Sequence, residues 1–302
     1  MHLRNALRAC VIDDGEVVAV EDLAPDVPTT VPALLAGGVE QIRRLEGLLR
    51  QSTARRTPLD QVRLGPPVPR PGKILAAGLN YADHVRESGF QKPDYPIFFN
   101  KQTTCVTGPF DPIHRPRVST MLDYEGELAV VIGTRCRYVP LSRAREVVGG
   151  YTVINDVSVR DWQLRAPTMT LGKSFDTHGP MGPWVVTADE LGDPHTLRLT
   201  TRVNGEVRQD DLTSSMIFNC WQQIETLSAA FTLEPGDIIA TGTPAGVAGA
   251  MDPPRFLAPG DIVSVEIEDV GRIENAVVQE PVPAPNEEAL LDSVGAQDEP
   301  AS

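Results

Sequence analysis

The chain reads DYEGELAVVIG from Asp123 to Gly133, which places a carboxylate at every second position before an apolar run. Successive side chains of a strand point to opposite faces, so Asp123, Glu125 and Glu127 share one face at spacings of roughly 7 Å. One interpretation is the solvated face of an edge strand, since most charged side chains lie at the surface. The apolar residues on both faces favour a buried strand instead, where carboxylates need a cation, a proton or an arginine. We therefore expect a divalent metal site, and hard oxygen donors favour Mg²⁺ or Mn²⁺ over zinc.

Another carboxylate interrupts a second apolar run. Asp156 lies within residues 152–159, which we expect to form a strand with Asp156 and Arg160 on one face. Asp156 could form a structural ion pair with Arg160 or another arginine. Alternatively it completes a metal site with Glu125 and Glu127, and the neighbouring acidic strand favours this interpretation.

His84 and Glu87 are three residues apart in a segment, 83–88, that we expect to be a short helix. They are then neighbours on one helical turn. A carboxylate beside a histidine fixes the imidazole tautomer and supports its protonated form, so the pair could act as a general base for water. The alternative is an ordinary solvated helix turn.

Lys173 follows a glycine and precedes a loop rich in glycine and proline. Such a lysine could hold a substrate carboxylate or polarise a carbonyl oxygen, although most lysines solvate the surface. Residues 240–247, ATGTPAGV, offer hydroxyls and backbone amides to a ligand but lack the spacing of a phosphate-binding loop. Three other histidines show no metal-ligand spacing, and we expect them to be ordinary loop residues: His114, His178 and His195.

Composition narrows the class of protein. The 302 residues can bury a large core, and 27 proline and 25 glycine residues favour a turn-rich, mainly β architecture. A formal net charge of −14 discourages nucleic acid or an anionic membrane as partner. The four cysteines are scattered without a C-x-x-C pair, which disfavours zinc binding and a disulfide framework. The N-terminus lacks the apolar region of a signal peptide and no apolar run approaches a membrane span, so we expect a cytoplasmic protein.

A proline- and glycine-rich segment divides the chain. Residues 65–72, GPPVPRPG, cannot continue a helix or a central strand. We therefore expect a small N-terminal α+β domain over residues 1–69 and a larger domain over residues 70–281. Residues 282–302 are acidic and rich in proline, and we expect them to be a disordered tail.

Local patterns predict several elements within these parts. We expect a hairpin turn at Asp13-Asp14-Gly15 and a helix over residues 39–49 in the N-terminal part. In the larger part we expect strands over 73–78, 127–132, 152–159, 184–187 and 197–203, a hairpin turn at Asn204-Gly205, and a helix over 215–230.

Six motifs, in their order along the chain, resemble those of one enzyme family. The motifs are GLNY through Glu87, DYEGELAVVIG, GYTVINDVSVRDWQ, GKSFDTHGPMGPW, VNGEVRQ and LEPGDIIATGTPAGV. Over about residues 70–280 the chain resembles the fumarylacetoacetate hydrolase family, including its bacterial acylpyruvase and 2-hydroxyhepta-2,4-diene-1,7-dioate isomerase types. The resemblance implies an α+β, mainly β fold in which a mixed β-sandwich roll follows a small N-terminal domain. It also implies an Mg²⁺ or Mn²⁺ cofactor and a homodimer.

The resemblance assigns roles to the candidate residues. Metal ligands are Glu125, Glu127 and Asp156, with Asp123 supporting them. The catalytic residues are His84, Glu87 and Lys173. The residues that contact substrate oxygens are Arg160, Gln163 and Thr243.

The implied activity is hydrolysis of a carbon–carbon bond in a small 1,3-diketo acid, such as an acylpyruvate or a fumarylacetoacetate-like compound. Water activated by His84 and Glu87 would attack a carbonyl, and the metal would stabilise the enolate that leaves. A decarboxylase or isomerase of 2-oxo or hydroxymuconate-type diacids would use the same enolate chemistry. A metabolite-binding protein without activity is the third alternative, and the intact catalytic residues argue against it.

Overall fold

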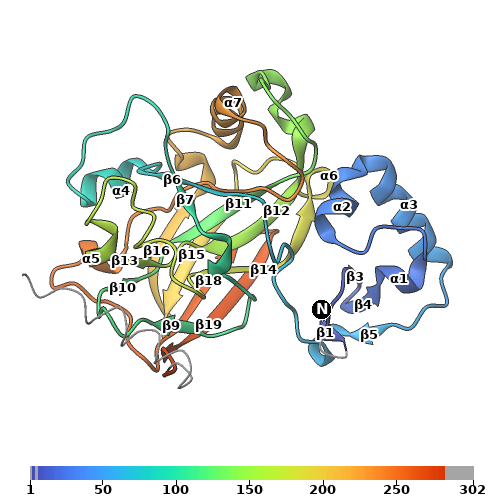
Figure 1. Cartoon of the computed structure of the whole chain (residues 1–302), viewed down its shortest axis with the longest axis horizontal. Coiled ribbons are helices and arrows are strands. Elements are labelled where there is room, and N and C mark those ends of the chain that lie inside the picture. The colour runs from blue at the N-terminus through green and yellow to red at the C-terminus, as the bar shows by residue number, and fades with distance from the viewer. Residues whose placement is uncertain (1, 4–5, 283–302) are drawn as a thin grey trace, which may run out of the picture.

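Two β-sheets form the larger part of the computed structural model, which describes residues 2–3 and 6–282 (Figure 1). The first sheet has the strand order β7-β6-β17-β11-β12-β14-β8, and the second has the order β16-β15-β18-β19-β9. The strands of the first are Ile97–Lys101, Ile74–Gly78, Ile238–Ala240, Gly126–Ile132, Val148–Asn155, Gly179–Thr187 and Val106–Thr107. Those of the second are Glu206–Leu212, Arg198–Val203, Ile262–Ile267, Gly271–Gln279 and Ile113–Arg115. This mixed, strand-rich architecture confirms the predicted α+β, mainly β fold class.

The N-terminal part has two small sheets of its own, with the strand orders β1-β2 and β3-β4-β5, and Figure 1 shows this part to one side of the two large sheets. The hairpin turn predicted at Asp13-Asp14-Gly15 is confirmed, because Asp14 and Gly15 have φ values of 47° and 74°, as a two-residue hairpin turn requires. No helix or strand occurs within residues 65–72, and the predicted domain boundary there stays a prediction. The elements of this part are β1 (His2–Leu3), β2 (Ala6–Leu7), β3 (Cys10–Asp13), β4 (Glu16–Ala19), α1 (Val20–Leu23), α2 (Val31–Ala36), α3 (Gly38–Gln51), β5 (Thr57–Pro58) and η1 (Leu59–Gln61).

Short elements connect the strands of the two large sheets. The helices are α4 (Ala82–Glu87), α5 (Arg160–Gln163), α6 (Ala188–Leu191) and α7 (Cys220–Ala230). Two very short strands, β10 (Leu122–Asp123) and β13 (Ser158–Val159), pair with each other. The 3₁₀ turns are η2 (Thr103–Cys105), η3 (Leu141–Val147), η4 (Thr213–Ser215) and η5 (Ala248–Ala250).

Strand β11 is buried along its whole length because apolar residues cover both of its faces. Leu128 and Val130 belong to a cluster that includes Val265 of the second sheet, whereas Ala129 and Val131 belong to another cluster. A central strand of this kind needs apolar side chains on both faces. The buried position predicted for this segment is therefore confirmed, and the acidic residues at its start are drawn into the interior.

Two of the predicted strands are interrupted at an acidic residue. The alternating acidic strand is broken, because Tyr124 and Glu125 lie between β10 and β11. The strand predicted over residues 152–159 breaks after Asn155, and Arg160 begins α5 instead of sharing a strand face with Asp156. Each break allows a side chain to leave the two-residue alternation of a regular strand. Arg160 can therefore reach the acidic residues from a helical turn.

The helix predicted over residues 215–230 begins later, at Cys220. Asn219 accepts a hydrogen bond from the backbone N–H of Gln222, and the Gln222 side chain accepts one from the backbone N–H of Asn219. This reciprocal capping box satisfies the free N–H groups of the first turn and fixes where the helix starts. The hairpin turn at Asn204-Gly205 is confirmed, with φ values of 52° and 80°.

Some predictions concern chain ends and cysteines. All four cysteines are free thiols. No helix in the part of the chain that the structure describes is long and apolar enough to cross a membrane. The predicted disordered tail, 282–302, lies outside the described residues apart from Val282.

His178 is a buried residue, which corrects the expectation of an ordinary loop histidine. Its Nε2 lies 2.9 Å from the carbonyl oxygen of His114, and its Nδ1 has no hydrogen-bond partner among the described residues. Burial lowers the pKa of His178 to about 3. The imidazole is therefore neutral in the folded protein at pH values where the unfolded chain is already protonated.

Acidification below about pH 6.5 is expected to destabilise the fold through His178, by up to about 1.4 kcal/mol per pH unit. The sign follows because the unfolded chain binds a proton there and the folded chain does not, so stability falls as pH falls toward the folded pKa. His178→Gln keeps a donor toward His114 and should remove this part of the pH dependence. Urea unfolding at several pH values measures the effect, and an identical slope in both proteins would contradict it.

Candidate metal centre and catalytic pair

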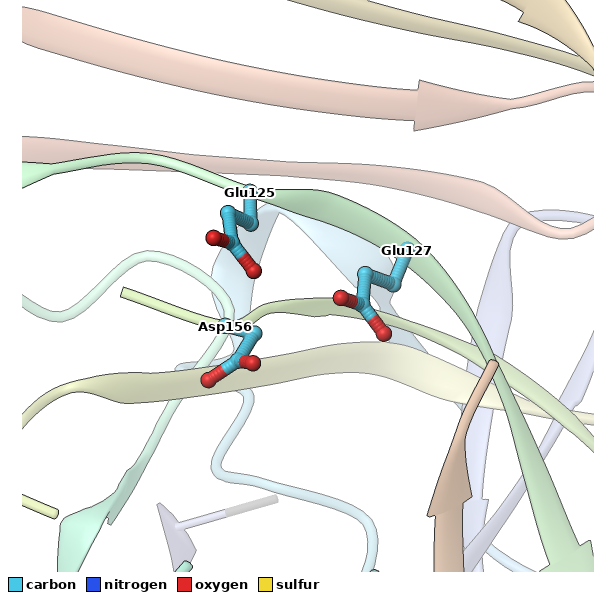
Figure 2. A group of neighbouring side chains, drawn as sticks. All are labelled: Glu125, Glu127 and Asp156. Atoms are coloured by element: carbon cyan, nitrogen blue, oxygen red, sulfur yellow. The ribbon is translucent and has the colours of Figure 1, made fainter. Parts of the chain in front are cut away.

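Three carboxylates converge on one point, and we call Glu125, Glu127 and Asp156 the acidic cluster. Each offers an oxygen atom that lies within 4.8 Å of the others, and Figure 2 shows the three side chains as neighbours. The antiparallel pairing of β11 with β12 brings them together, since Gly126 lies opposite Asn155. The backbone N–H of Asp156 donates to the carbonyl oxygen of Glu125 at 2.8 Å. Two adjacent strand ends therefore present the whole cluster.

Three cationic side chains surround the cluster. Lys173 Nζ lies 2.6 Å from Glu125 Oε2 and 2.9 Å from Asp156 Oδ2. Arg160 donates to Glu125 Oε1 at 2.6 Å, and Lys101 Nζ lies 2.6 Å from Asp156 Oδ1. Both lysine side chains are almost completely buried. Buried charges of this kind need partners, and here each cation has at least one carboxylate.

The carboxylates of the cluster are in unequal electrostatic environments. Burial raises the pKa of Glu127 well above its usual range, and the negative charges of Asp156 and Glu125 raise it further. Burial also acts to raise the pKa of Glu125, but the Lys173 ammonium and the Arg160 guanidinium outweigh it and hold that pKa well below its usual range. Burial lowers the pKa of Lys173, and the charges of Asp156 and Glu125 more than compensate, so that it is raised overall. Glu127 is therefore the member that most lacks a positive partner.

The donor set of the cluster fits a hard divalent cation. Glu127 Oε2 accepts a hydrogen bond from the backbone N–H of Gly242 at 2.7 Å. Glu127 Oε1 is buried and has no hydrogen-bond partner in the part of the chain that the structure describes. A buried oxygen without a partner is costly unless something binds it. Three carboxylates suit Mg²⁺ or Mn²⁺, so Glu125, Glu127 and Asp156 together could hold such an ion.

His84 and Glu87 form the predicted pair on α4. His84 Nδ1 lies 2.7 Å from Glu87 Oε1, and His84 is buried. Glu87 Oε2 also accepts a hydrogen bond from the backbone N–H of Gly246 at 2.8 Å, which fixes the carboxylate between the helix and the 241–247 loop. The pair is close enough to the cluster for a positive charge on His84 to lower the pKa of Glu125. Glu87 can thus hold a proton on Nδ1 and leave Nε2 free to accept one.

The three residues predicted to contact substrate lie in different settings. Arg160 is bound to Asp123 at 2.8 Å as well as to Glu125, and its Nη2 has no hydrogen-bond partner among the described residues. Gln163, at the end of α5, accepts a hydrogen bond from Arg160 at 2.8 Å. The Thr243 hydroxyl donates to the carbonyl oxygen of Gly126 at 3.0 Å, so its proton is already used inside the protein. Their substrate roles stay predictions, and Thr243 could contribute only as an acceptor or through its backbone.

Asp123 supports the site without joining the cluster. Its carboxylate accepts hydrogen bonds from Arg160 and from the backbone N–H groups of Ala248 and Gly249. Asp123 therefore links two parts of the site. One is the guanidinium of Arg160, which also binds Glu125, and the other is the backbone at Ala248 and Gly249. Its supporting role at a metal site stays a prediction.

Lys101 was not among the residues that the sequence singled out. It ends β7, in the segment IFFNK, and its side chain is completely buried beside Asp156. The only local signal is a lysine at the end of a largely apolar strand, which also fits a lysine that reaches solvent. Its position becomes evident only when β7 and the Asp156 segment are brought together in space.

Comparison with known proteins gives the same family as the motifs. The family model described as "Fumarylacetoacetate (FAA) hydrolase C-terminal" matches residues 73–278. The protein named "Oxaloacetate tautomerase FAHD2A, mitochondrial" from Bos taurus is 42% identical over 269 residues, which cover 87% of this chain and 84% of that protein.

Two solved structures are similar to this chain in both fold and sequence. The 2-hydroxyhepta-2,4-diene-1,7-dioate isomerase from Mycobacterium marinum is 40% identical with a TM-score of 0.67, covering 76% of this chain and 83% of that chain. Maleylpyruvate hydrolase from Sphingobium sp. SYK-6, solved with manganese(II) and pyruvate, is 34% identical with a TM-score of 0.76, covering 91% and 97%. By their names, these similar proteins include a tautomerase, an isomerase and a hydrolase.

Proposed function

Because the chain belongs to the fumarylacetoacetate hydrolase family, we propose that it is a divalent-metal-dependent enzyme that hydrolyses a carbon–carbon bond in a 1,3-diketo acid. The observation that carries the proposal is the His84–Glu87 pair beside the acidic cluster, since only hydrolysis requires an activated water. The manganese(II) and pyruvate bound by the maleylpyruvate hydrolase support the choice of metal and of a pyruvate-releasing reaction. An acylpyruvate-like compound is the substrate class we favour.

The residues of this chain divide the reaction between them. A divalent ion held by the acidic cluster would polarise the oxygen atoms of the substrate. His84, oriented by Glu87, takes a proton from water at Nε2 as the water oxygen attacks the distal carbonyl carbon. The carbon–carbon bond then breaks, its electron pair stays with the pyruvate-forming fragment, and that fragment later takes up a proton. In this proposal Lys173 and Gln163 stabilise the negative charge that develops on oxygen.

A lyase or isomerase acting on 2-oxo or hydroxymuconate-type diacids is the second candidate. The tautomerase and the isomerase among the similar proteins favour it. Tautomerisation and isomerisation only move protons, and decarboxylation breaks a different carbon–carbon bond, so these reactions share the electron-withdrawing site but need no attacking water. The product therefore distinguishes the two candidates.

A substrate panel with identified products tests the proposal. Purified protein with Mn²⁺ or Mg²⁺ is expected to convert an acylpyruvate into equimolar pyruvate and carboxylic acid, and chelator-treated protein should not. Magnetic resonance spectra of the mixture identify both products. Enol–keto conversion of oxaloacetate or release of CO₂ without a second acid would support the second candidate instead. Failure to convert any diketo or 2-oxo acid would leave the metabolite-binding alternative.

The assembly and the surroundings of the enzyme also remain proposals. We propose a homodimer that acts on a small 2-oxo or diketo acid without nucleic acid or membrane partners, as the family resemblance and the net charge of −14 suggest. A cytoplasmic location stays a prediction.

A further inference from the structure

Lys101 has an ammonium group with no access to solvent. The group donates to Asp156 Oδ1 at 2.6 Å, to the carbonyl oxygen of Val157 at 3.4 Å and, at short range, to the carbonyl oxygen of Lys173. An ammonium has three N–H donors, and here each has an acceptor. Burying a cation costs free energy that this complete set of partners offsets. Lys101 therefore has no spare donor with which to bind substrate.

The three acceptors come from the two segments that carry the site. Asp156 and Val157 form the break between β12 and β13, and Lys173 lies in the loop before β14. Next to Lys101 in the chain, the backbone N–H of Gln102 donates to the Ser174 hydroxyl oxygen at 3.0 Å, which adds a second bond to the same loop. The end of β7 thus ties the segment of a cluster carboxylate to the backbone of Lys173.

The position of Asp156 depends on this tie. One of its oxygens is bound by Lys101 and the other by Lys173, so the two lysines together fix the rotation of the carboxylate. Hydrogen bonds from its N–H to the Glu125 carbonyl and to its C=O from the Ser158 hydroxyl hold the Asp156 backbone, so the two lysines act on the side chain, whose rotation the backbone bonds leave open. Groups that bond to metal ligands from outside orient them and tune the affinity of the site.

We propose that Lys101 is a positioning residue, which orients Asp156 for the metal ion and fixes the backbone of Lys173 without touching the substrate. The inference rests on the proposed metal-dependent function. It predicts that loss of Lys101 changes the Mn²⁺ affinity in the direction opposite to a simple charge effect. Removing a cation beside Asp156 would strengthen Mn²⁺ binding if charge alone mattered, whereas loss of positioning weakens it.

Mn²⁺ titration of full-length Lys101→Met by calorimetry tests the proposal. The expected result is a Kd raised by about 10- to 100-fold, the range typical for loss of a group that orients a metal ligand. Lys101→Arg keeps the charge and a bond to Asp156, and it should recover part of the affinity. Lys73→Met is the matched control, because Lys73 pairs at 2.6 Å with the buried Asp237 instead of the cluster, and it should bind Mn²⁺ like the parent.

Equal or tighter Mn²⁺ binding by Lys101→Met would overturn the proposal. If that variant does not fold, as judged by circular dichroism, Lys101→Arg decides the matter: weaker binding at an unchanged melting temperature supports positioning, and parental affinity contradicts it. Absence of Mn²⁺ binding in the parent protein would instead contradict the proposed metal-dependent function. The two failures are therefore distinguishable.

Discussion

His84→Ala is expected to lower kcat for hydrolysis of an acylpyruvate by about 10²- to 10⁴-fold, the usual contribution of a general base. The Nδ1 of His84 is held 2.7 Å from Glu87 Oε1, which leaves Nε2 as the acceptor for the proton of water. Alanine removes that acceptor but leaves the acidic cluster intact. Mn²⁺ affinity should therefore stay close to that of the parent, and steady-state kinetics with calorimetry separates the two quantities.

The chain offers a matched control for this variant. His195 Nδ1 is also paired with a carboxylate, Asp193 Oδ1, at 2.9 Å, but it packs against Trp221 and caps the backbone N–H of Cys220. His195→Ala should keep its hydrolytic activity. Decarboxylation, where present, should survive in part in His84→Ala because it does not need activated water. Equal loss of hydrolysis and of decarboxylation would contradict the assignment of His84 to water.

Local patterns predicted the buried strand and the convergence of three carboxylates at its start. The apolar run after Glu127 has apolar side chains on both faces, which favours a central strand of a sheet that is covered on both sides. β11 is such a strand. Once that strand is buried, the carboxylates at its start need a cation, a proton or an arginine. The predicted association of Glu125, Glu127 and Asp156 follows from this physical requirement, and the structure brings the three together. The family match over residues 73–278 confirms the resemblance drawn from the motifs.

Long-range hydrogen bonds account for what the patterns could not predict. Two-residue periodicity extends a strand through Glu125, but the backbone N–H of Glu125 donates to the Asn155 side chain at 2.9 Å and the chain leaves the strand there. The same holds for Arg160, whose place in α5 depends on its backbone bond to Met121. Lys101 could not be recognised because its partners, Asp156 and Lys173, are distant in sequence and no local spacing links them. Contacts of this kind are set by the fold, and local sequence does not encode them separately.

Glu127→Gln is expected to weaken Mn²⁺ binding by more than the roughly 10- to 100-fold that loss of an outer positioning group causes, since it neutralises a proposed ligand. Glutamine keeps an acceptor for the backbone N–H of Gly242, so the local structure should persist. Calorimetric titration measures the affinity. Glu266→Gln, an exposed glutamate in β18, is the control and should bind Mn²⁺ like the parent.

The same substitution should have the opposite effect on stability when a chelator removes divalent ions. Burial and the charges of Asp156 and Glu125 raise the pKa of Glu127, so the stability it contributes is present below the unfolded pKa and is lost as pH rises toward the folded pKa. Glutamine cannot ionise, and its amide can donate to the neighbouring carboxylates. With chelator at pH 8, Glu127→Gln should therefore unfold at higher urea concentration than the parent, by a free energy of about 1–3 kcal/mol.

Mn²⁺ at 1,000 times the Kd of the parent should reverse that order, because it stabilises the folded parent by about 4.1 kcal/mol and stabilises the variant, which binds the ion far more weakly, by much less. Urea unfolding of both proteins with chelator and with Mn²⁺ gives the four values needed. A reversal of relative stability between chelator and Mn²⁺ is a stronger test than either comparison alone. A general packing defect in the variant would make it less stable than the parent under both conditions. A parent that is more stable than Glu127→Gln even in chelator would show that the buried carboxylate is compensated within the protein, and the case for an ion between Glu125, Glu127 and Asp156 would lose its physical basis.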